Sequence, residues 1–131
     1  MLGPAHGPWS ITDIGAEGYR LACGRTPSPF SGCGEILRGS TLVCWPMSDD
    51  TSDWSINGRD IHRSTLARLD PGVEYASLTS RPLNWAALIV PPAAHGWPAA
   101  FHANEIPHDA MTRIRGLTRT AIYLARANEV P

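Results

Sequence analysis

Short apolar runs, broken at regular intervals by turn-forming residues, constrain the fold of this chain more than any other feature of its sequence. They occupy residues 53–91. The turns fall at Asn57-Gly58, Asp70-Pro71-Gly72 and Arg81-Pro82. Runs this short, bounded by Gly, Pro, Asn and Asp, are typical of antiparallel strands in a meander. The sequence therefore predicts a mainly β protein.

The length and composition indicate one domain of ordinary globular type. The chain has 131 residues, of which 43% are hydrophobic and 18% charged, which is enough apolar material for a core. Twelve glycines and twelve prolines favour a turn-rich β protein over a helical bundle. We expect a single domain over residues 1–131, with a loose lead-in at 1–8 and a β body at 9–107.

Charge and hydropathy give no indication of a membrane or of direct binding to nucleic acid. The formal net charge is −1, so no overall electrostatic attraction to DNA or anionic lipid is expected. The first residues lack the pattern of a signal peptide, and no apolar stretch approaches the roughly 20 residues that cross a bilayer. Cys23, Cys33 and Cys44 form no CxxC pair, which favours reduced thiols. We expect a cytoplasmic protein without a membrane partner.

Apolar runs and turn signals also predict approximate strand positions within the β body. The most hydrophobic run, at residues 84–90, is the expected central strand of the core, since Pro91-Pro92 ends it. The other expected elements are strands at 9–14 and 18–23 separated by Gly15, a hairpin over 35–46 around Arg38-Gly39, a loop over 26–35 and irregular chain over 93–107.

The spacing of apolar residues changes to a helical period near the C-terminus. Asp109 stands where a helix N-cap belongs, and a helix is predicted over residues 109–128. The apolar stripe expected to face the body consists of Met111, Ile114, Leu117, Ala121, Leu124 and Ala125. The arginines at 113, 115, 119 and 126 are expected on the solvated faces. We interpret this helix as a dimerisation or docking element.

Histidines were the first candidates for chemistry, and their spacing supports no local site. His102, Glu105 and His108 are three residues apart, which places Glu105 on the opposite face of a strand, while Pro107 would interrupt a helix. His62 and His95 could join them only through the fold. A nucleophile elbow and a Gly-rich phosphate loop are both absent. The sequence therefore predicts no metal, no cofactor and no catalytic residue.

Large aromatic side chains are the remaining candidates for a functional site. Rings inside a β sandwich can line a pocket for a small apolar ligand, or they can fill the core themselves. Arg81, in the turn before the expected central strand, could orient an anionic group at the mouth of such a pocket. The candidate ligand-binding residues are Trp45, Trp54, Tyr75, Arg81 and Trp85.

The order of these motifs resembles the N-terminal sensor domain of AraC-type transcriptional regulators. The resemblance rests on WSING at residues 54–58, LDPGVE at 69–74 and the strand from Trp85 to Pro91, and it covers about residues 30–130. It implies a cupin-like antiparallel β-sandwich or barrel, effector binding inside the β body and dimerisation through the helical part.

The sequence departs from that family in two ways. The two helix-turn-helix units are absent, so contact with DNA would need an absent or separate domain. The cupin metal motif, G-x5-H-x-H-x3,4-E followed by G, is also missing, so no functional residue of the family transfers to this chain.

Together these observations predict a cupin-like domain with a C-terminal helix that binds a small-molecule effector and forms a homodimer through that helix. The alternative is a small cupin-like enzyme, an isomerase or a metal-dependent one, whose histidines meet through the fold. A third hypothesis is a structural subunit whose interior is too full for a ligand.

Overall fold

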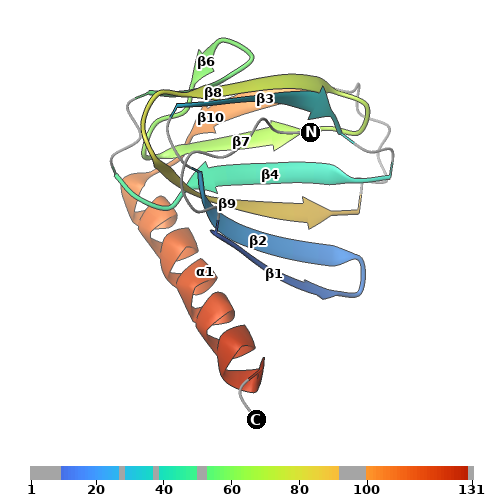
Figure 1. Ribbon diagram of the computed structural model, residues 1–131, viewed down its shortest axis with the longest axis vertical. Coiled ribbons are helices and arrows are strands. Elements are labelled where there is room, and N and C mark those ends of the chain that lie inside the picture. The colour runs from blue at the N-terminus through green and yellow to red at the C-terminus, as the bar shows by residue number, and fades with distance from the viewer. Residues whose placement is uncertain (1–9, 27–28, 37–38, 50–52, 92–99, 130–131) are drawn as a thin grey trace.

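Strands follow one another along most of the chain, and a helix follows the last of them (Figure 1). The computed structural model describes residues 10–26, 29–36, 39–49, 53–91 and 100–129. The strands are β1 (Ser10–Ala16), β2 (Tyr19–Thr26), β3 (Phe30–Glu35), β4 (Thr41–Pro46), β5 (Trp54–Ile56), β6 (Arg59–Asp60), β7 (Thr65–Leu69), β8 (Glu74–Thr79), β9 (Leu83–Val90) and β10 (Phe101–Glu105). The helix is α1 (His108–Glu129).

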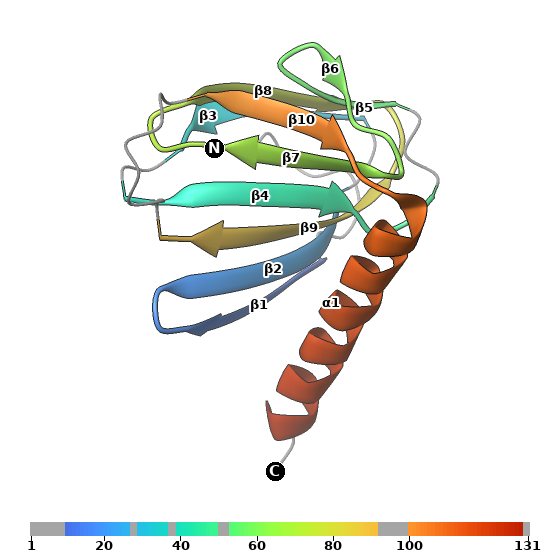
Figure 2. The same cartoon turned by 180° about the vertical axis from the view of Figure 1, so that it is seen from behind.

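The strands form two antiparallel sheets. One has six strands in the order β1-β2-β9-β4-β7-β10, and the other has four in the order β3-β8-β5-β6. The sheets stack as two layers, and α1 crosses the outer face of the six-stranded sheet, with its C-terminal half running past β1 and β2 (Figures 1 and 2). The predicted mainly β sandwich with a C-terminal helix is confirmed, but within the described residues the sheets do not close into a barrel.

Alternation along the strands separates two apolar clusters, one on each face of the six-stranded sheet. On β4, Cys44 belongs to the core between the sheets, whereas the next residue, Trp45, belongs to the cluster beneath α1. On β9, Trp85 and Ala86 divide in the same way. Successive side chains of a strand point to opposite faces, so one strand contributes to both clusters.

The two strongest turn signals are confirmed. Asn57 and Gly58 connect β5 to β6 with φ values of 50° and 77°, the left-handed conformation that an Asn-Gly hairpin turn requires. In the second turn, the Val73 amide donates to the Asp70 carbonyl at 3.1 Å, and Gly72 has a φ of 83°. A positive φ at the third residue of such a turn favours glycine, because a side chain there would be strained.

The expected central strand is also confirmed. The predicted run at 84–90 forms β9, which pairs with β2 on one side and β4 on the other. Its continuous hydrophobic sequence fits this position, because both of its faces are covered, by the opposite sheet and in part by α1.

Three expectations for irregular or locally paired chain are wrong. The loop predicted over residues 26–35 contains β3, which pairs with β8, and the irregular segment predicted over 93–107 contains β10, which pairs with β7. The hairpin predicted over 35–46 does not form, since β3 and β4 lie in different sheets. In each case the local sequence gives only a weak strand signal, and pairing with strands distant in sequence decides the structure.

At the N-terminal end, the two predicted strands are present but their boundary is misplaced. The β1–β2 turn lies at Glu17 and Gly18, which have φ values of 54° and 86°, while Gly15 is inside β1 and pairs with Arg20. The lead-in predicted at residues 1–8 lies outside the described residues.

The predicted helix is confirmed, but it begins at His108, so Asp109 lies in its first turn and is not the expected N-cap. Its buried face also differs from the expected stripe. Met111 is fully buried, as expected, whereas Leu117 and Leu124 are 65% and 55% exposed. Arg115 and Thr118 are buried in their place. The stripe is displaced because Arg115 donates hydrogen bonds to acceptors of the β body, while Thr118 Oγ1 donates to the Ile114 carbonyl of its own helix. Neither polar side chain is therefore buried without a partner, so hydrophobicity alone does not decide which face packs. Within the described residues, no helix is long and apolar enough to span a membrane.

Candidate functional site: an aromatic cavity between the sheets

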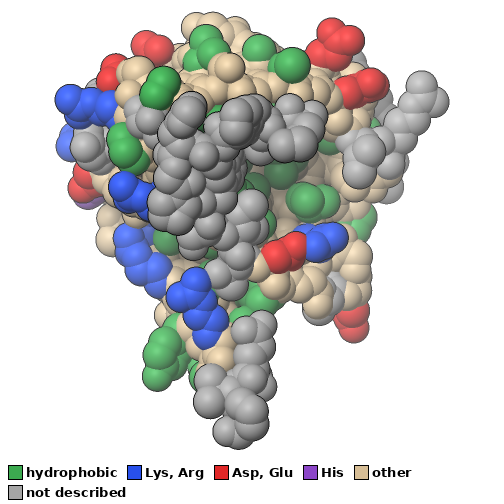
Figure 3. Space-filling model, in the orientation of Figure 1, with side chains coloured by type: hydrophobic (Ala, Val, Ile, Leu, Met, Phe, Trp, Pro, Cys, Tyr) green, Lys and Arg blue, Asp and Glu red, His purple; other side chains and the backbone are tan. Residues whose placement is uncertain are grey.

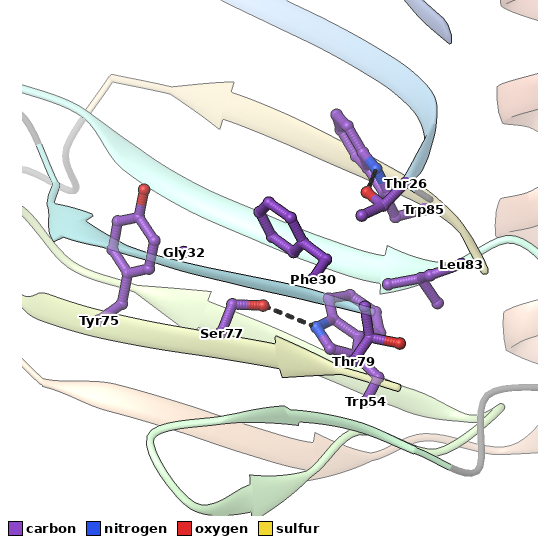
Figure 4. Close-up of a pocket in the computed structure, with 9 residues that line it drawn as sticks. All are labelled: Thr26, Phe30, Gly32, Trp54, Tyr75, Ser77, Thr79, Leu83 and Trp85. Carbon is purple, nitrogen blue, oxygen red and sulfur yellow. Dashed lines mark hydrogen bonds between the residues drawn. The ribbon is translucent and has the colours of Figure 1, made fainter. Parts of the chain in front are cut away.

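A cavity of about 200 Å³ lies between the two sheets (Figure 4). Its walls come from five strands, so residues far apart in sequence meet there. The lining residues are Thr26, Phe30, Gly32, Trp54, Tyr75, Ser77, Thr79, Leu83 and Trp85. Four of these nine carry aromatic rings, which makes the walls mainly apolar.

The hollow lies where β3 presents glycine to the interior. Phe30 and Gly32 alternate with the exposed Ser31 along β3, and both line the cavity. Gly32 stands opposite Ser77 of β8 in the strand register. A residue without a side chain, opposite a residue with a small one, leaves space that a Leu or Val would fill.

The indole N–H groups in the cavity walls are already paired. Trp54 Nε1 donates to Ser77 Oγ at 3.0 Å, and Trp85 Nε1 donates to Thr26 Oγ1 at 2.8 Å; both bonds are drawn in Figure 4. These bonds fix the planes of the two rings and leave their faces and edges for apolar contact. A buried indole without such a partner would cost free energy.

Tyr75 lies across the end of β3. Its strand partner is Gly34, and a Cβ built on Gly34 would stand 3.0 Å from the Tyr75 hydroxyl oxygen and 3.2 Å from two ring carbons. That spacing is closer than ordinary van der Waals contact, so the ring occupies the space that a side chain at position 34 would need. Gly34 therefore permits the position of the tyrosine.

The cavity is electrically neutral. None of its nine lining residues is Asp, Glu, His, Lys or Arg. Burying a charged group costs several kcal/mol unless it is paired. The walls therefore suit an uncharged molecule, and an ion would lose its hydration without gaining a partner.

Of the five candidate residues predicted from the sequence, the structure brings three together at this cavity: Trp54, Tyr75 and Trp85. Trp45 is on the other face of the six-stranded sheet, in the cluster beneath α1. Arg81 is exposed in the turn after β8 and forms an ion pair with Asp53 at 3.3 Å. Neither of these two lines the cavity.

The candidates predicted from the sequence do not include the small and polar lining residues. Ser77 and Thr79 follow Tyr75 at intervals of two, which is the signal of one strand face, and Phe30 and Gly32 share the same interval on β3. The signal on β3 is weak by itself, because two prolines and two glycines among residues 26–35 favour a loop.

A second feature missed from the sequence is a buried arginine that fastens α1 to the β body. Arg115 Nε donates to the Pro46 carbonyl at 2.9 Å, and Nη1 donates to Asp49 Oδ1 at 2.7 Å. Its Nη2 donates to the carbonyls of Ser48 (3.2 Å) and Arg63. The expectation that Arg115 lies on a solvated helix face is therefore wrong.

The three cysteines lie in three different layers. Cys33 is exposed on β3, Cys23 is partly buried on β2 in the cluster beneath α1, and Cys44 is buried between the sheets. Burial raises the pKa of Cys44 to about 12, so its thiol stays protonated and unreactive at neutral pH. None of the three lines the cavity.

The histidines do not assemble into a site within the described residues. His62, His102 and His108 are exposed, and no group of three His, Cys, Asp or Glu side chains in the described part of the chain could hold a metal ion. His95 lies outside the described residues. The alternative of a histidine-based enzyme gains no support from this part of the molecule.

No model of a known protein family and no curated protein sequence matches the chain. Six chains of solved structures are similar to it. One is vicilin from Corylus avellana (hazelnut), with 18% sequence identity and a TM-score of 0.43, over 70% of this chain and 27% of that one. The present chain thus spans about a quarter of the vicilin chain.

Proposed function

We propose that this chain is a small-molecule-binding domain whose ligand occupies the cavity between the two sheets. The observation that carries the proposal is the cavity itself: about 200 Å³ of space, walled by four aromatic rings whose polar atoms are largely paired within the protein. Pockets for small organic ligands are typically concave, mainly apolar and provided with a few polar groups. A closely packed structural core would leave no such space.

A route from the cavity to α1 supports a regulatory use of this binding. Trp85 lines the cavity, and its partner across the β9–β4 ladder is Pro46. The carbonyl of Pro46 accepts the hydrogen bond from Arg115 Nε on α1. A ligand that shifts Trp85 would thus act on a strand segment bonded directly to the helix. Such a ligand changes the preferred helix position only as far as it binds one position more tightly than the other.

The exposed apolar side chains of α1 support the further proposal that the helix mediates homodimerisation. Leu117 and Leu124 are seven residues apart, two turns along one side of α1, and both are more than half exposed. Figure 3 shows hydrophobic side chains exposed at the lower end of the molecule, beside arginine side chains. In an AraC-type regulator, this dimer would position DNA-binding domains that are absent from this sequence or lie on a separate chain.

The cavity proposal is tested by titrating the purified chain with toluene, a neutral ring compound small enough for the space, in an isothermal titration calorimeter. We expect saturable binding at one site per chain. The variant Gly32→Leu places a side chain in the cavity and should abolish this binding, whereas Ser31→Leu, on the exposed face of the same strand, should not. Toluene binding that survives Gly32→Leu, or no ring compound binding at all, would refute the proposal.

The dimer proposal needs its own experiment, because binding and assembly can fail independently. Sedimentation equilibrium of the chain should give the mass of a dimer. The double variant Leu117→Glu, Leu124→Glu should give a monomer, and Thr112→Glu, at an exposed position elsewhere on α1, should leave the dimer intact. A wild-type monomer at all concentrations would exclude this role for the helix.

A further inference from the structure

The Tyr75 hydroxyl differs from the other polar groups around the cavity, which form hydrogen bonds within the protein. The two indole N–H groups donate to Ser77 and Thr26, and Thr79 Oγ1 donates to the Arg81 carbonyl at 2.7 Å. Within the described residues, the Tyr75 hydroxyl makes no hydrogen bond. Figure 4 shows its ring rising from β8 at one side of the cavity, with its oxygen unconnected. This hydroxyl is therefore available to a ligand.

The position of this hydroxyl is fixed by its surroundings. The ring lies over Gly34, close enough that a methyl group there would press on it. A tyrosine ring has only two side-chain torsions, so a ring packed against the neighbouring strand presents its hydroxyl in a defined direction. A defined donor and acceptor at the edge of an apolar cavity is the arrangement that orients a ligand.

The volume of the cavity matches one ring. A dry apolar cavity of about 150 Å³ is sufficient for benzene in another protein. The present cavity, at about 200 Å³, accepts one six-membered ring with a single small substituent. Aromatic walls favour an aromatic ring, because offset and edge-to-face contacts add to the burial of its surface.

We propose, building on the function proposed above, that the ligand is a neutral single-ring aromatic compound bearing one oxygen, of the phenol class, which exchanges a hydrogen bond with the Tyr75 hydroxyl. The absence of any charged lining residue excludes the corresponding carboxylates, because benzoate would be buried without a cationic partner. Phenol, toluene and benzoate share the same ring and differ in its substituent, which is a hydroxyl, a methyl or a carboxylate group. The cavity walls should distinguish these three substituents.

Calorimetric titration of wild type and Tyr75→Phe with these three compounds tests the inference. The variant keeps the ring and removes only the hydroxyl. We expect it to weaken phenol binding about fivefold, the effect of one neutral hydrogen bond, and to leave toluene binding unchanged. Benzoate should bind neither protein. Tyr19→Phe, on the exposed β1–β2 hairpin, is the matched control and should change none of these affinities.

The outcomes separate this inference from the broader function. Suppose that toluene binds, but that Tyr75→Phe weakens the binding of phenol and of toluene equally, or the binding of neither. The cavity then binds ligands, and the role of Tyr75 is refuted. Benzoate binding as tightly as phenol would refute the neutral class. If no ring compound binds wild type, the proposed function fails as well.

A measurement on the wild-type chain keeps the test valid if Tyr75→Phe does not fold. In protein with ¹³C-labelled tyrosine, phenol should shift the ring resonances of Tyr75. The chain has three tyrosines. The other two, Tyr19 and Tyr123, are 52% and 72% exposed and serve as internal references. A saturating phenol titration that leaves the Tyr75 signals in place would overturn the inference.

Discussion

The two faces of the six-stranded sheet each carry a tryptophan, on neighbouring strands, yet they are packed differently. Trp85 on β9 faces the smaller sheet and lines a cavity. Trp45 on β4 faces α1 and is only 5% exposed, in a cluster with Met47, Ala86 and Met111. The inner face is covered by a strand with glycine at its centre, while the outer face is covered by a helix that carries long side chains.

This difference shows how the covering element decides whether a sheet face is closely packed or borders a cavity. Methionine side chains are flexible and fill irregular gaps, so the outer cluster closes around Trp45. Its closure has a cost, since Trp45 Nε1 is buried and finds no hydrogen-bond partner among the described residues. On the inner face Trp85 Nε1 is bonded, but Gly32 supplies no atoms to fill the space.

Arg115→Ala should have the largest effect on stability, because it removes the polar attachment of the outer layer. Four hydrogen-bond acceptors lose a charged donor, including the Pro46 and Arg63 carbonyls. We expect the free energy of unfolding to fall by about 3 kcal/mol or more, measured by urea denaturation. Arg113→Ala, at an exposed position of the same helix, should change it by less than about 0.5 kcal/mol. Equal effects of the two variants on stability would contradict the claim that Arg115 attaches α1 to the β body.

Truncation on each face tests the packing difference directly. Met111→Ala should cost about 3 kcal/mol, because the side chain is fully buried and its removal opens a new cavity. Phe30→Ala, beside a space that already exists, should cost about half as much, since the ring borders the cavity and is only partly buried. Urea denaturation of both variants measures the two values. A Phe30→Ala cost above that of Met111→Ala would show the inner face to be the better packed one.

Filling the inner face should make it resemble the outer one. Gly32→Leu inserts apolar atoms into the cavity and should raise the free energy of unfolding by about 1 kcal/mol. Differential scanning calorimetry of this variant beside Ser31→Leu, which points away from the cavity, gives the comparison. A large loss of stability specific to Gly32→Leu would mean that the space is smaller than described.

Gly116→Ala should stabilise the outer layer by up to about 1 kcal/mol. Gly116 is inside α1 and exposed, and a Cβ added there meets no atom within 4 Å. Alanine therefore gains helix propensity without a clash. Thermal unfolding followed by circular dichroism should show a higher melting temperature, and a lower one would indicate a contact that requires glycine.

The smallest expected effect is the dependence of the helix attachment on pH. The hydrogen bond and charge of Arg115 hold the pKa of Asp49 below its ordinary value of 3.8. A lowered folded-state pKa stabilises the protein above pH 3.8, and the contribution is lost as pH falls through the folded-state value. Wild type should be slightly more stable than Asp49→Asn at pH 7, and urea titrations should show this difference shrinking below pH 3.8. A stability difference between wild type and Asp49→Asn that grows below pH 3.8 would contradict this prediction.

Local chemistry predicted the fold where the information lies within a few residues. The turns at Asn57-Gly58 and Asp70-Pro71-Gly72, the apolar run of β9 and the helical period after Asp109 were identified because each depends on neighbouring residues alone. Strands β3 and β10 were missed, since glycine or mixed sequence gives them little local preference and their partners are distant in sequence.

The features of the candidate site also divide into those that the sequence indicates and those that only the tertiary structure shows. Of the aromatic residues proposed from the sequence, Trp54, Tyr75 and Trp85 line one cavity, and their role in binding stays a prediction. The sequence could not distinguish them from Trp45, because the face to which a strand residue points depends on the register of its sheet. Nor could it show that Arg115 is buried, because the helix has polar residues on every side and only contact with the body selects one.

By itself, the sequence determined that this chain forms short strands joined by tight turns and ends in a helix, because turn conformation and periodicity are properties of adjacent residues. Only the tertiary structure decided that Gly32 of β3 stands opposite Ser77 of β8 and lines the same cavity as Trp54 and Trp85. A cavity is the space left between elements after they pack. It depends on positions that carry no side chain as much as on positions that carry large ones. That arrangement exists only when distant strands pair.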